Sequence, residues 1–309
     1  AWMLLPLVLL LALRPRVTWP TYALGALLVL LCVLTRQIFL WAAGLLWLSA
    51  WLGTDQGEDR PSALLPAHER WTLAPRSLRA AIAFGATVPA FGAVAYFFIL
   101  WGGLTPPLFR TGGDAAMELA GTHTGANPSV VLLTLAIFAL AGVFFAGYLL
   151  APVHRAWTER RTLCVRACSI GAGAGLVLAL ALPSSFSRED GRYSGLWNLI
   201  NKLPTLADRS PVMLALAPLG GLTLALIWLC LPRRSSWVLV GSVAGFAIAQ
   251  SANHQAWQRY VEPMALLTLL LAAALAQAGG SRRPPRWAPA GPLLLAGGLL
   301  LITLPRIGS

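Results

Sequence analysis

The chain has 309 residues, of which 57% are hydrophobic and only 11% are charged, and its mean hydropathy is +0.70. Soluble domains carry about 25% charged residues, so this composition excludes an ordinary soluble fold. A helical crossing of the hydrocarbon core needs about 20 apolar residues, and inside lipid the backbone polar groups must pair within the segment. The sequence therefore predicts an all-α protein, a polytopic bundle of transmembrane helices.

The net charge of +12 does not indicate a nucleic-acid partner. A nucleic-acid-binding domain gathers its basic residues on one soluble face. Here the arginines lie in short loops between apolar runs, which is how membrane proteins encode their orientation. We expect membrane lipid, and no nucleic acid, among the partners.

Ten apolar runs follow one another along the chain and are the candidate membrane segments. They are Trp2–Leu13, Thr21–Leu34, Ile38–Leu52, Ala80–Gly103, Val130–Ala151, Cys164–Pro183, Val212–Pro232, Trp237–Gln250, Tyr260–Ala278 and Gly291–Pro305. Only Thr35-Arg36-Gln37 separates the second from the third. One helix through both would be about 48 Å long, more than a tilted helix needs to cross. We therefore predict two short helices that meet at this tripeptide.

The loop charges predict the orientation of the bundle. If the loop with Arg14 is cytoplasmic and the loops alternate, 15 of the 23 basic residues fall on the cytoplasmic side, as the positive-inside rule expects. The arginine-rich cytoplasmic loops are interpreted as plain anchors. We predict one transmembrane domain over residues 1–309, a cytoplasmic loop at 53–79 and non-cytoplasmic loops at 104–129, 184–211 and 251–259.

Two further expectations concern the origin of the chain. Arginine outnumbers lysine by 22 to 1, which is typical of GC-rich bacterial genomes, so we expect a multi-pass protein of a bacterial inner membrane. The chain starts at Ala1 inside an apolar run, and we expect it to be the C-terminal part of a longer protein.

Small residues inside the apolar runs are assigned to packing. Cysteines 32, 164, 168 and 230 have no nearby histidine and no CxxC spacing, so they are interpreted as packing residues. Gly171, Gly173 and Gly175, and the pair Gly241 and Gly245, have spacings that let helices approach closely.

The Thr35-Arg36-Gln37 junction is the first candidate site. A charged side chain between two apolar runs is costly unless it meets water, a partner or a ligand. The planar fork of Arg36 suits a phosphate, and Gln37 can donate and accept beside it. The alternative is an arginine whose side chain snorkels from a helix end to the membrane interface.

The second candidate site is the segment 253–260, where hydrogen-bonding side chains gather at a predicted membrane edge. An aromatic belt would explain its tryptophan and tyrosine but not the other polar residues. The residues assigned to substrate binding are Asn253, His254, Gln258, Arg259 and Tyr260. Arg259 suits an anionic head group, although Glu262 at i+3 is an alternative salt-bridge partner.

The third candidate lies in the predicted loop 104–129, where His123 is a possible proton carrier or phosphate ligand; a solvated loop histidine is the alternative reading. No His, Asp, Glu and Cys combination has metal-ligand spacing, so we expect no metal site, and no motif indicates a cofactor. The acids on the same predicted side are weak candidates for a catalytic base: Asp114, Glu118, Glu189, Asp190 and Asp208.

These polar residues resemble motifs of the GT-C superfamily, polytopic membrane glycosyltransferases that use lipid-phosphate sugar donors on the non-cytoplasmic face. The stretch Thr35-Arg36-Gln37-Ile38-Phe39-Leu40-Trp41 is similar to the Arg-Gln region of dolichyl-phosphate-glucose glucosyltransferases. Arg259-Tyr260 with Pro263 resembles a late Arg-Tyr…Pro signature of bacterial members.

The resemblance implies a glycosyltransferase whose partner is a polyprenyl-phosphate-linked sugar donor, with Arg36, Gln37, Arg259 and Tyr260 at the donor. The family's catalytic acid or base lies in the first outer loop, and no matching acidic motif precedes Trp2. Two other readings stay open, a secondary transporter or flippase and a non-catalytic membrane assembly subunit. A transporter would favour polar residues and broken helices near the bilayer centre.

Overall fold

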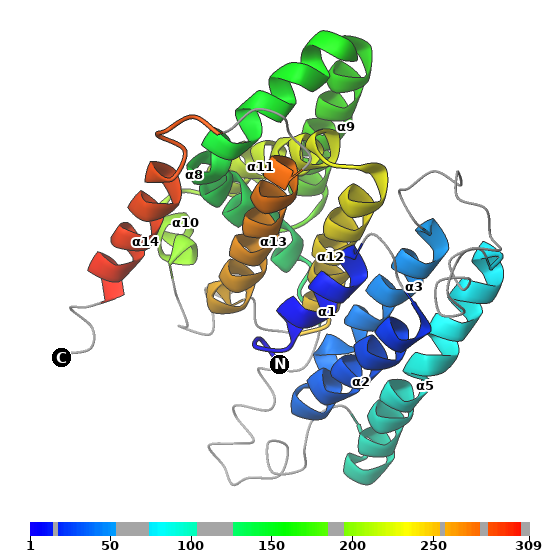
Figure 1. Cartoon of the computed structure of the whole chain (residues 1–309). Helices are drawn as coiled ribbons and strands as arrows, with labels where there is room; N and C mark the ends of the chain where they lie inside the picture. The colour runs from blue at the N-terminus through cyan, green and yellow to red at the C-terminus, as the bar shows by residue number, and fades with distance from the viewer. Residues whose placement is uncertain are drawn as a thin grey trace, which may run out of the picture. The chain divides into compact units, whose positions relative to one another are not determined.

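The computed structural model describes residues 1–14, 18–53, 74–103, 126–184, 195–253, 257–278 and 284–303. Within these ranges the regular structure is helical, with one isolated β-bridge between Leu206 and Arg209. The all-α prediction is therefore confirmed, and each of the ten apolar runs forms helix. The helices are α1 (Leu5–Leu13), α2 (Trp19–Thr35), the 3-10 helix η1 (Gln37–Trp41), α3 (Ala42–Leu52), α5 (Arg76–Trp101), α8 (Ser129–Glu159), α9 (Arg161–Ala181), α10 (Leu196–Lys202), α11 (Pro211–Cys230), α12 (Arg233–Ser251), α13 (Gln258–Ala278) and α14 (Ala290–Thr303) (Figure 1).

Five helices in the described part of the chain are long and apolar enough to cross a membrane, namely α5, α8, α9, α11 and α13. The protein therefore has the helices of an integral membrane protein. The structure supports five of the ten predicted crossings, because the other runs form shorter or more polar helices. Helix α1, with nine residues, is about 14 Å long, less than half the hydrocarbon thickness.

The helices pack into two compact units within the predicted transmembrane domain. The first unit contains Ala1–Asn127 and Pro232–Gln255, and the second contains Pro128–Leu231 and Ala256–Ser309. Helix α12 thus belongs with the N-terminal helices, where it packs against α1, η1 and α3.

In the first unit the helices alternate in direction, with the break at Arg36 as a turning point. The Tyr22 hydroxyl, near the start of α2, is hydrogen-bonded to Ser49, near the end of α3. At the other end of α2, the Cys32 thiol contacts the carbonyl of Ala1 at 3.9 Å. Helix α2 therefore runs the length of the unit and α3 returns, which confirms two helices meeting at Thr35-Arg36-Gln37.

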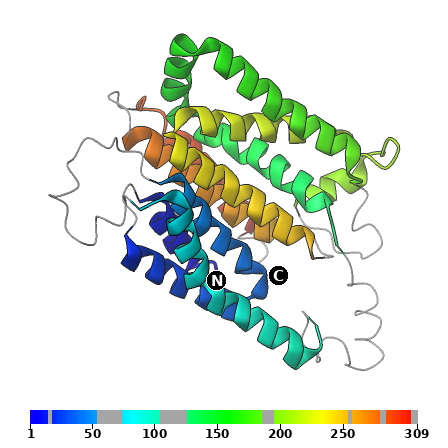
Figure 2. The ribbon, with the colours of Figure 1, turned by 90° about the vertical axis from the view of Figure 1, so that its right-hand side faces the viewer.

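In the second unit α8, α11 and α13 run parallel to one another, and α9 runs against them. The starts of α8 and α11 lie at one end, because Ser129 Oγ donates to Pro183 O at the end of α9 and the Ser210 N–H donates to Ser184 Oγ. Near the opposite end, Gln277 of α13 donates to the carbonyl of Tyr148 in α8 at 2.8 Å. The α8–α9 corner and the start of α13 therefore lie at opposite ends of this unit, as the predicted loop alternation requires; Figure 2 shows α8 and α9 side by side.

Glycines bring several helices into close contact, as predicted. A Cβ on Gly171 of α9 would lie 2.5 Å from the carbonyl oxygen of Gly221 in α11. Gly175, one turn further, faces Ala217 of α11 equally closely. In the first unit, Gly241 faces Leu48 and Gly245 faces Trp41. Gly173 differs from the expectation, because its Cβ would meet nothing within 4 Å.

The boundaries of the predicted loops shift where polar residues are helical. Helix α5 begins at Arg76, with Pro75 at its N-cap, so the predicted loop 53–79 ends earlier. Helix α8 continues to Glu159, past the predicted end at Ala151. Helix α10 lies inside the predicted loop 184–211. The four cysteines are free thiols, and Cys32 and Cys164 are buried, as expected of packing residues.

Candidate functional site

The N-terminus of α13 holds the most developed of the predicted constellations. The Arg259 guanidinium carbon lies 4.6 Å from the Trp257 ring centroid and 5.2 Å from that of Tyr260, and Nη2 approaches the Tyr260 hydroxyl at 3.5 Å. Both distances to the rings are within the range of cation–π attraction. Arg259 is nevertheless exposed, so two aromatic rings orient a guanidinium whose edge faces out of the unit.

Gln258 has a structural role beside this arginine. Its Oε1 accepts the backbone N–H of Leu196 at 2.6 Å, and its Nε2 donates to Glu262. Gly195, at φ +54°, lets the chain pass this amide, because a Cβ there would collide with the Gln258 side chain. The sequence left Glu262 open as a salt-bridge partner of Arg259, but its carboxylate accepts a hydrogen bond from Gln258. Gln258 in turn holds the start of α10 against α13.

The backbone of the first turn of α13 adds to its capacity for anions. The start of a helix carries positive potential, and in α13 the Tyr260 N–H donates to the Trp257 carbonyl at 3.0 Å. The guanidinium and the helix start together form a positively charged edge.

Arg36 occupies the second predicted position, in the first unit. Its φ and ψ of −159° and 117° are extended, between the end of α2 and the start of η1. Thr35 Oγ1 donates to the Cys32 carbonyl at 2.6 Å and the Arg36 N–H donates to the same oxygen. Arg36 is exposed and Gln37 is half-buried, so the break in the helix turns the arginine side chain outward.

An aromatic cluster fixes the segment that follows Arg36. The Trp2 ring packs edge-on against Phe39 with centroids 5.3 Å apart, and it also meets Phe246 at 6.0 Å. Trp41 packs against Phe246 at 6.1 Å. Phe39 and Phe246 are almost fully buried. The short 3-10 helix is therefore held by aromatic packing, which sets where Arg36 emerges.

The remaining predicted residues are placed as follows. Asn253 is exposed at the end of α12, where its Nδ2 donates to Gln250 Oε1 at 3.2 Å. It belongs to the first unit, whereas Gln258, Arg259 and Tyr260 belong to the second, so the predicted motif is divided between the units. Asp208 caps the connection before α11, where its carbonyl accepts from the Ser184 N–H. Six candidates lie outside the described residues: Asp114, Glu118, His123, Glu189, Asp190 and His254.

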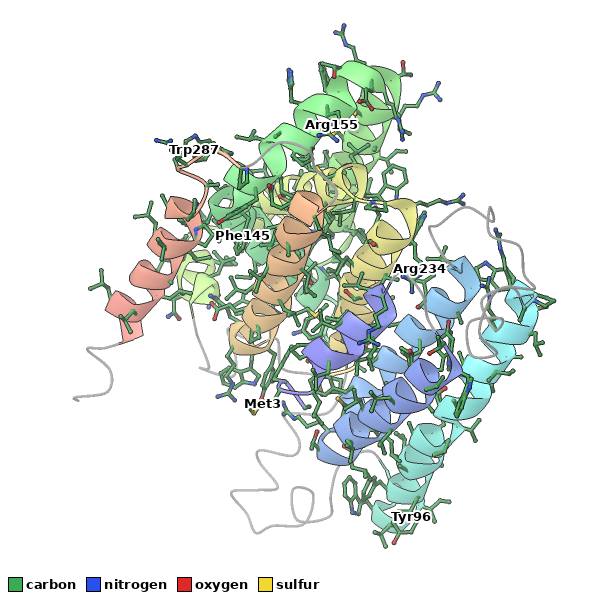
Figure 3. The ribbon with its side chains drawn as sticks, in the orientation of Figure 1. Met3, Tyr96, Phe145, Arg155, Arg234 and Trp287 are labelled. Carbon is green, nitrogen blue, oxygen red and sulfur yellow. The ribbon has the colours of Figure 1, made fainter. Side chains whose placement is uncertain are left out.

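A polar cluster around Arg234 is a feature that the sequence interpretation missed. The sequence predicts that Arg234, like Arg233, is a plain anchor, but the Arg234 side chain is only 2% exposed. Figure 3 labels this residue. Its guanidinium donates to the carbonyls of Arg14 and Ala12, each at 2.6 Å, and to Ser49 Oγ at 2.7 Å. We refer to these four residues as the Arg234 cluster. It satisfies carbonyls at the end of α1 and joins that end to α3 and α12, which is a structural role.

Arg79 was likewise interpreted as an anchor and is 7% exposed. Its guanidinium packs against Gly53, whose φ is +77° and whose missing side chain leaves room for it. One feature of the sequence could have indicated these roles. Arg79 and Arg234 each lie in the first turn of an apolar helix that follows a proline, Pro75 and Pro232 respectively.

Among the described residues, no group of three or more His, Cys, Asp or Glu is arranged to hold a metal ion. The sites at Arg259 and Arg36 instead present exposed arginines, aromatic rings and backbone donors at the ends of apolar helices. Comparison with known proteins gives no match to a family, to a curated protein or to a solved structure.

Proposed function

We propose that the protein is a membrane glycosyltransferase that takes a sugar from a polyprenyl-phosphate donor at the non-cytoplasmic face of a bacterial inner membrane. The observation that carries the proposal is Arg259, exposed at the start of α13 between the rings of Trp257 and Tyr260. The resemblance of its motifs to GT-C enzymes supplies the reaction class, and the ten-crossing GT-C-like bundle belongs to the same proposal.

The chemistry of the donor fits this arrangement. A lipid-linked sugar presents its phosphate at the membrane edge, where the polar tips of membrane-belt aromatics lie. Sugar transfer leaves negative charge on that phosphate, and a positioned arginine stabilises the developing charge. The two rings hold the guanidinium at little cost in side-chain entropy, since its position is set before the donor binds.

Arg36 is a second phosphate contact in this proposal, to be tested separately. A charged side chain between two apolar helices costs free energy in a membrane. Binding of an anionic ligand to Arg36 would offset this cost. The catalytic base is left unassigned. The transporter reading is less favoured, because α5, α8, α11 and α13 continue through their internal prolines instead of breaking there.

The test is sugar release by the full-length protein in proteoliposomes from short-chain polyprenyl phosphates that carry glucose, mannose or arabinose. We expect turnover with one donor, and a loss of about 10²-fold in kcat/KM for Arg259→Ala, the size of removing one charge-stabilising donor. Arg259→Lys should recover only part of this, because an ammonium lacks the planar fork. Arg286→Ala, at an exposed arginine near the start of α14, is the matched control and should be unchanged.

Two results would overturn the proposal. One is the absence of turnover with all three donors by a folded protein. The other is turnover that Arg259→Ala and Arg286→Ala reduce equally.

A further inference from the structure

The corner between α8 and α9 is an exposed basic surface that the proposed function does not use. Helix α8 ends at Glu159 and α9 begins at Arg161, so Arg160 alone joins them, with φ −141° and ψ 46°. A one-residue connection leaves little freedom between the two helices. Side chains at this corner are therefore held in fixed relation to each other.

Four exposed arginines and one acid lie at this corner. The arginines are Arg155, Arg160, Arg161 and Arg166, and the acid is Glu159. Figure 3 labels Arg155 on α8 near this corner. Trp157 is 42% exposed, and the Arg161 guanidinium lies 5.7 Å from its ring centroid. Arginine beside tryptophan is the composition of a membrane interface.

Helix length places this surface at the depth of lipid head groups. Helix α8 has 31 residues, about 46 Å, against a hydrocarbon thickness of about 30 Å. Its last eight residues, from Pro152 to Glu159, include His154, Arg155, Thr158 and Glu159 and extend about 12 Å. The first turn and a half of α9, up to Arg166, covers a similar height. The arginines therefore lie where phospholipid phosphates are found.

Helix α9 continues from the arginines as an open apolar stripe. Ile170, one turn after Arg166, is 71% exposed, and Val177, two turns further, is 64% exposed. Between them Gly173 has nothing within 4 Å of its Cβ position, so the stripe is notched. Residues 166, 170, 173 and 177 share one helix face, and this face carries a cation at its polar end and exposed apolar side chains beyond it.

We infer that this surface, the four arginines with the Ile170–Gly173–Val177 stripe, binds an anionic phospholipid. The arginines contact the phosphate, and one acyl chain lies along the notch at Gly173. A net charge of three at one fixed corner complements an anionic head group, and juxtamembrane basic residues attract such lipids. The inference is independent of the glycosyltransferase proposal, since it concerns the opposite end of the second unit from Arg259.

The experiment is native mass spectrometry of the full chain, titrated with phosphatidylglycerol or with phosphatidylcholine of the same acyl chains. The test variant replaces Arg160, Arg161 and Arg166 by Gln. The control replaces three other exposed arginines on the same predicted side, Arg76, Arg233 and Arg286, by Gln. Both variants lose three charges, so a non-specific effect of charge would be equal in the two.

We expect the wild type to bind phosphatidylglycerol at least tenfold more tightly than phosphatidylcholine. The test variant should lose that preference, and the control should stay within twofold of wild type. Gly173→Trp, which fills the notch without changing charge, should weaken phosphatidylglycerol at least threefold. Equal binding of the two lipids by wild type, or equal loss in the two triple variants, would overturn the inference.

Discussion

Replacing Arg234 by alanine tests the structural role of the Arg234 cluster. The guanidinium makes three hydrogen bonds, to the carbonyls of Ala12 and Arg14 and to Ser49 Oγ. These bonds join the end of α1 to α12, which belongs to the first unit although it lies more than two hundred residues later in the sequence. Removal of this side chain should loosen α1 before the rest of the unit.

The size of the effect follows from what each acceptor retains. Ala12 O keeps a bond from Ser49 Oγ at 3.0 Å, and the bond to Arg14 O is only part-buried, so water can replace it. A hydrogen bond to a charged group contributes about 1.5–3 kcal/mol, and a buried acceptor left unsatisfied costs about 1–3 kcal/mol. We therefore expect Arg234→Ala to lower the free energy of unfolding by about 3 kcal/mol, a change of about 10²-fold in the unfolding equilibrium.

The assay is a reversible SDS titration of the purified protein in bicelles, followed by tryptophan fluorescence. Arg233→Ala is the matched control, because Arg233 is the adjacent residue and is exposed; it should change the free energy by less than about 0.5 kcal/mol. Arg234→Lys should fall between the two, since a single ammonium cannot reach all three acceptors in the same geometry. If Arg234→Ala were as stable as Arg233→Ala, the structural role given to the cluster would be refuted.

Three further predictions concern packing and local hydrogen bonds. Gly175→Leu should destabilise the protein by at least about 2 kcal/mol, because its side chain would enter the contact between α9 and α11; Gly173→Leu on the same helix should be tolerated, and SDS titrations that rank the two alike would contradict the packing. Gln258→Ala should increase hydrogen–deuterium exchange in α10, with the exchange of α9 unchanged as the internal control, and unaltered exchange in α10 would count against the Gln258 bond. The Trp47 Nε1 donates to Thr87 Oγ1 at 2.9 Å, so a double-mutant cycle of Trp47→Phe and Thr87→Val should give a coupling of about 0.5–1.5 kcal/mol, and a coupling of zero would contradict this bond.

The positions of the helices could be predicted because lipid imposes one local rule. A backbone in hydrocarbon must form its own hydrogen bonds, so every long apolar run becomes helix. The break at Arg36 followed from the length of the two apolar runs, which joined would exceed the hydrocarbon thickness; α8 is of similar length, but its last residues include charged side chains that can lie outside the hydrocarbon. The number of crossings could not be predicted from the apolar runs alone. Helix α1 is too short to cross the hydrocarbon core, and α12 contains too many polar residues.

The roles of individual polar residues depend on tertiary contacts that the sequence does not encode locally. Arg233 and Arg234 are adjacent and chemically identical, yet only Arg234 meets the carbonyls at the end of α1, more than two hundred residues away in sequence. Gln258 looked like a ligand for substrate, but its amide is used by the N–H of Leu196 from α10. Arg259, at the next position, points out of the unit and stays a candidate for substrate binding.

Both proposals depend most directly on the two ends of the second unit facing opposite sides of a membrane. Single cysteines at Lys202 and at Thr158, both exposed, would report the α10 end and the α8–α9 corner in a variant whose four native cysteines are replaced. With an impermeant maleimide on intact cells, we predict labelling at position 202, and labelling at position 158 only after the membrane is permeabilised. Labelling of both positions from the same side would contradict the account.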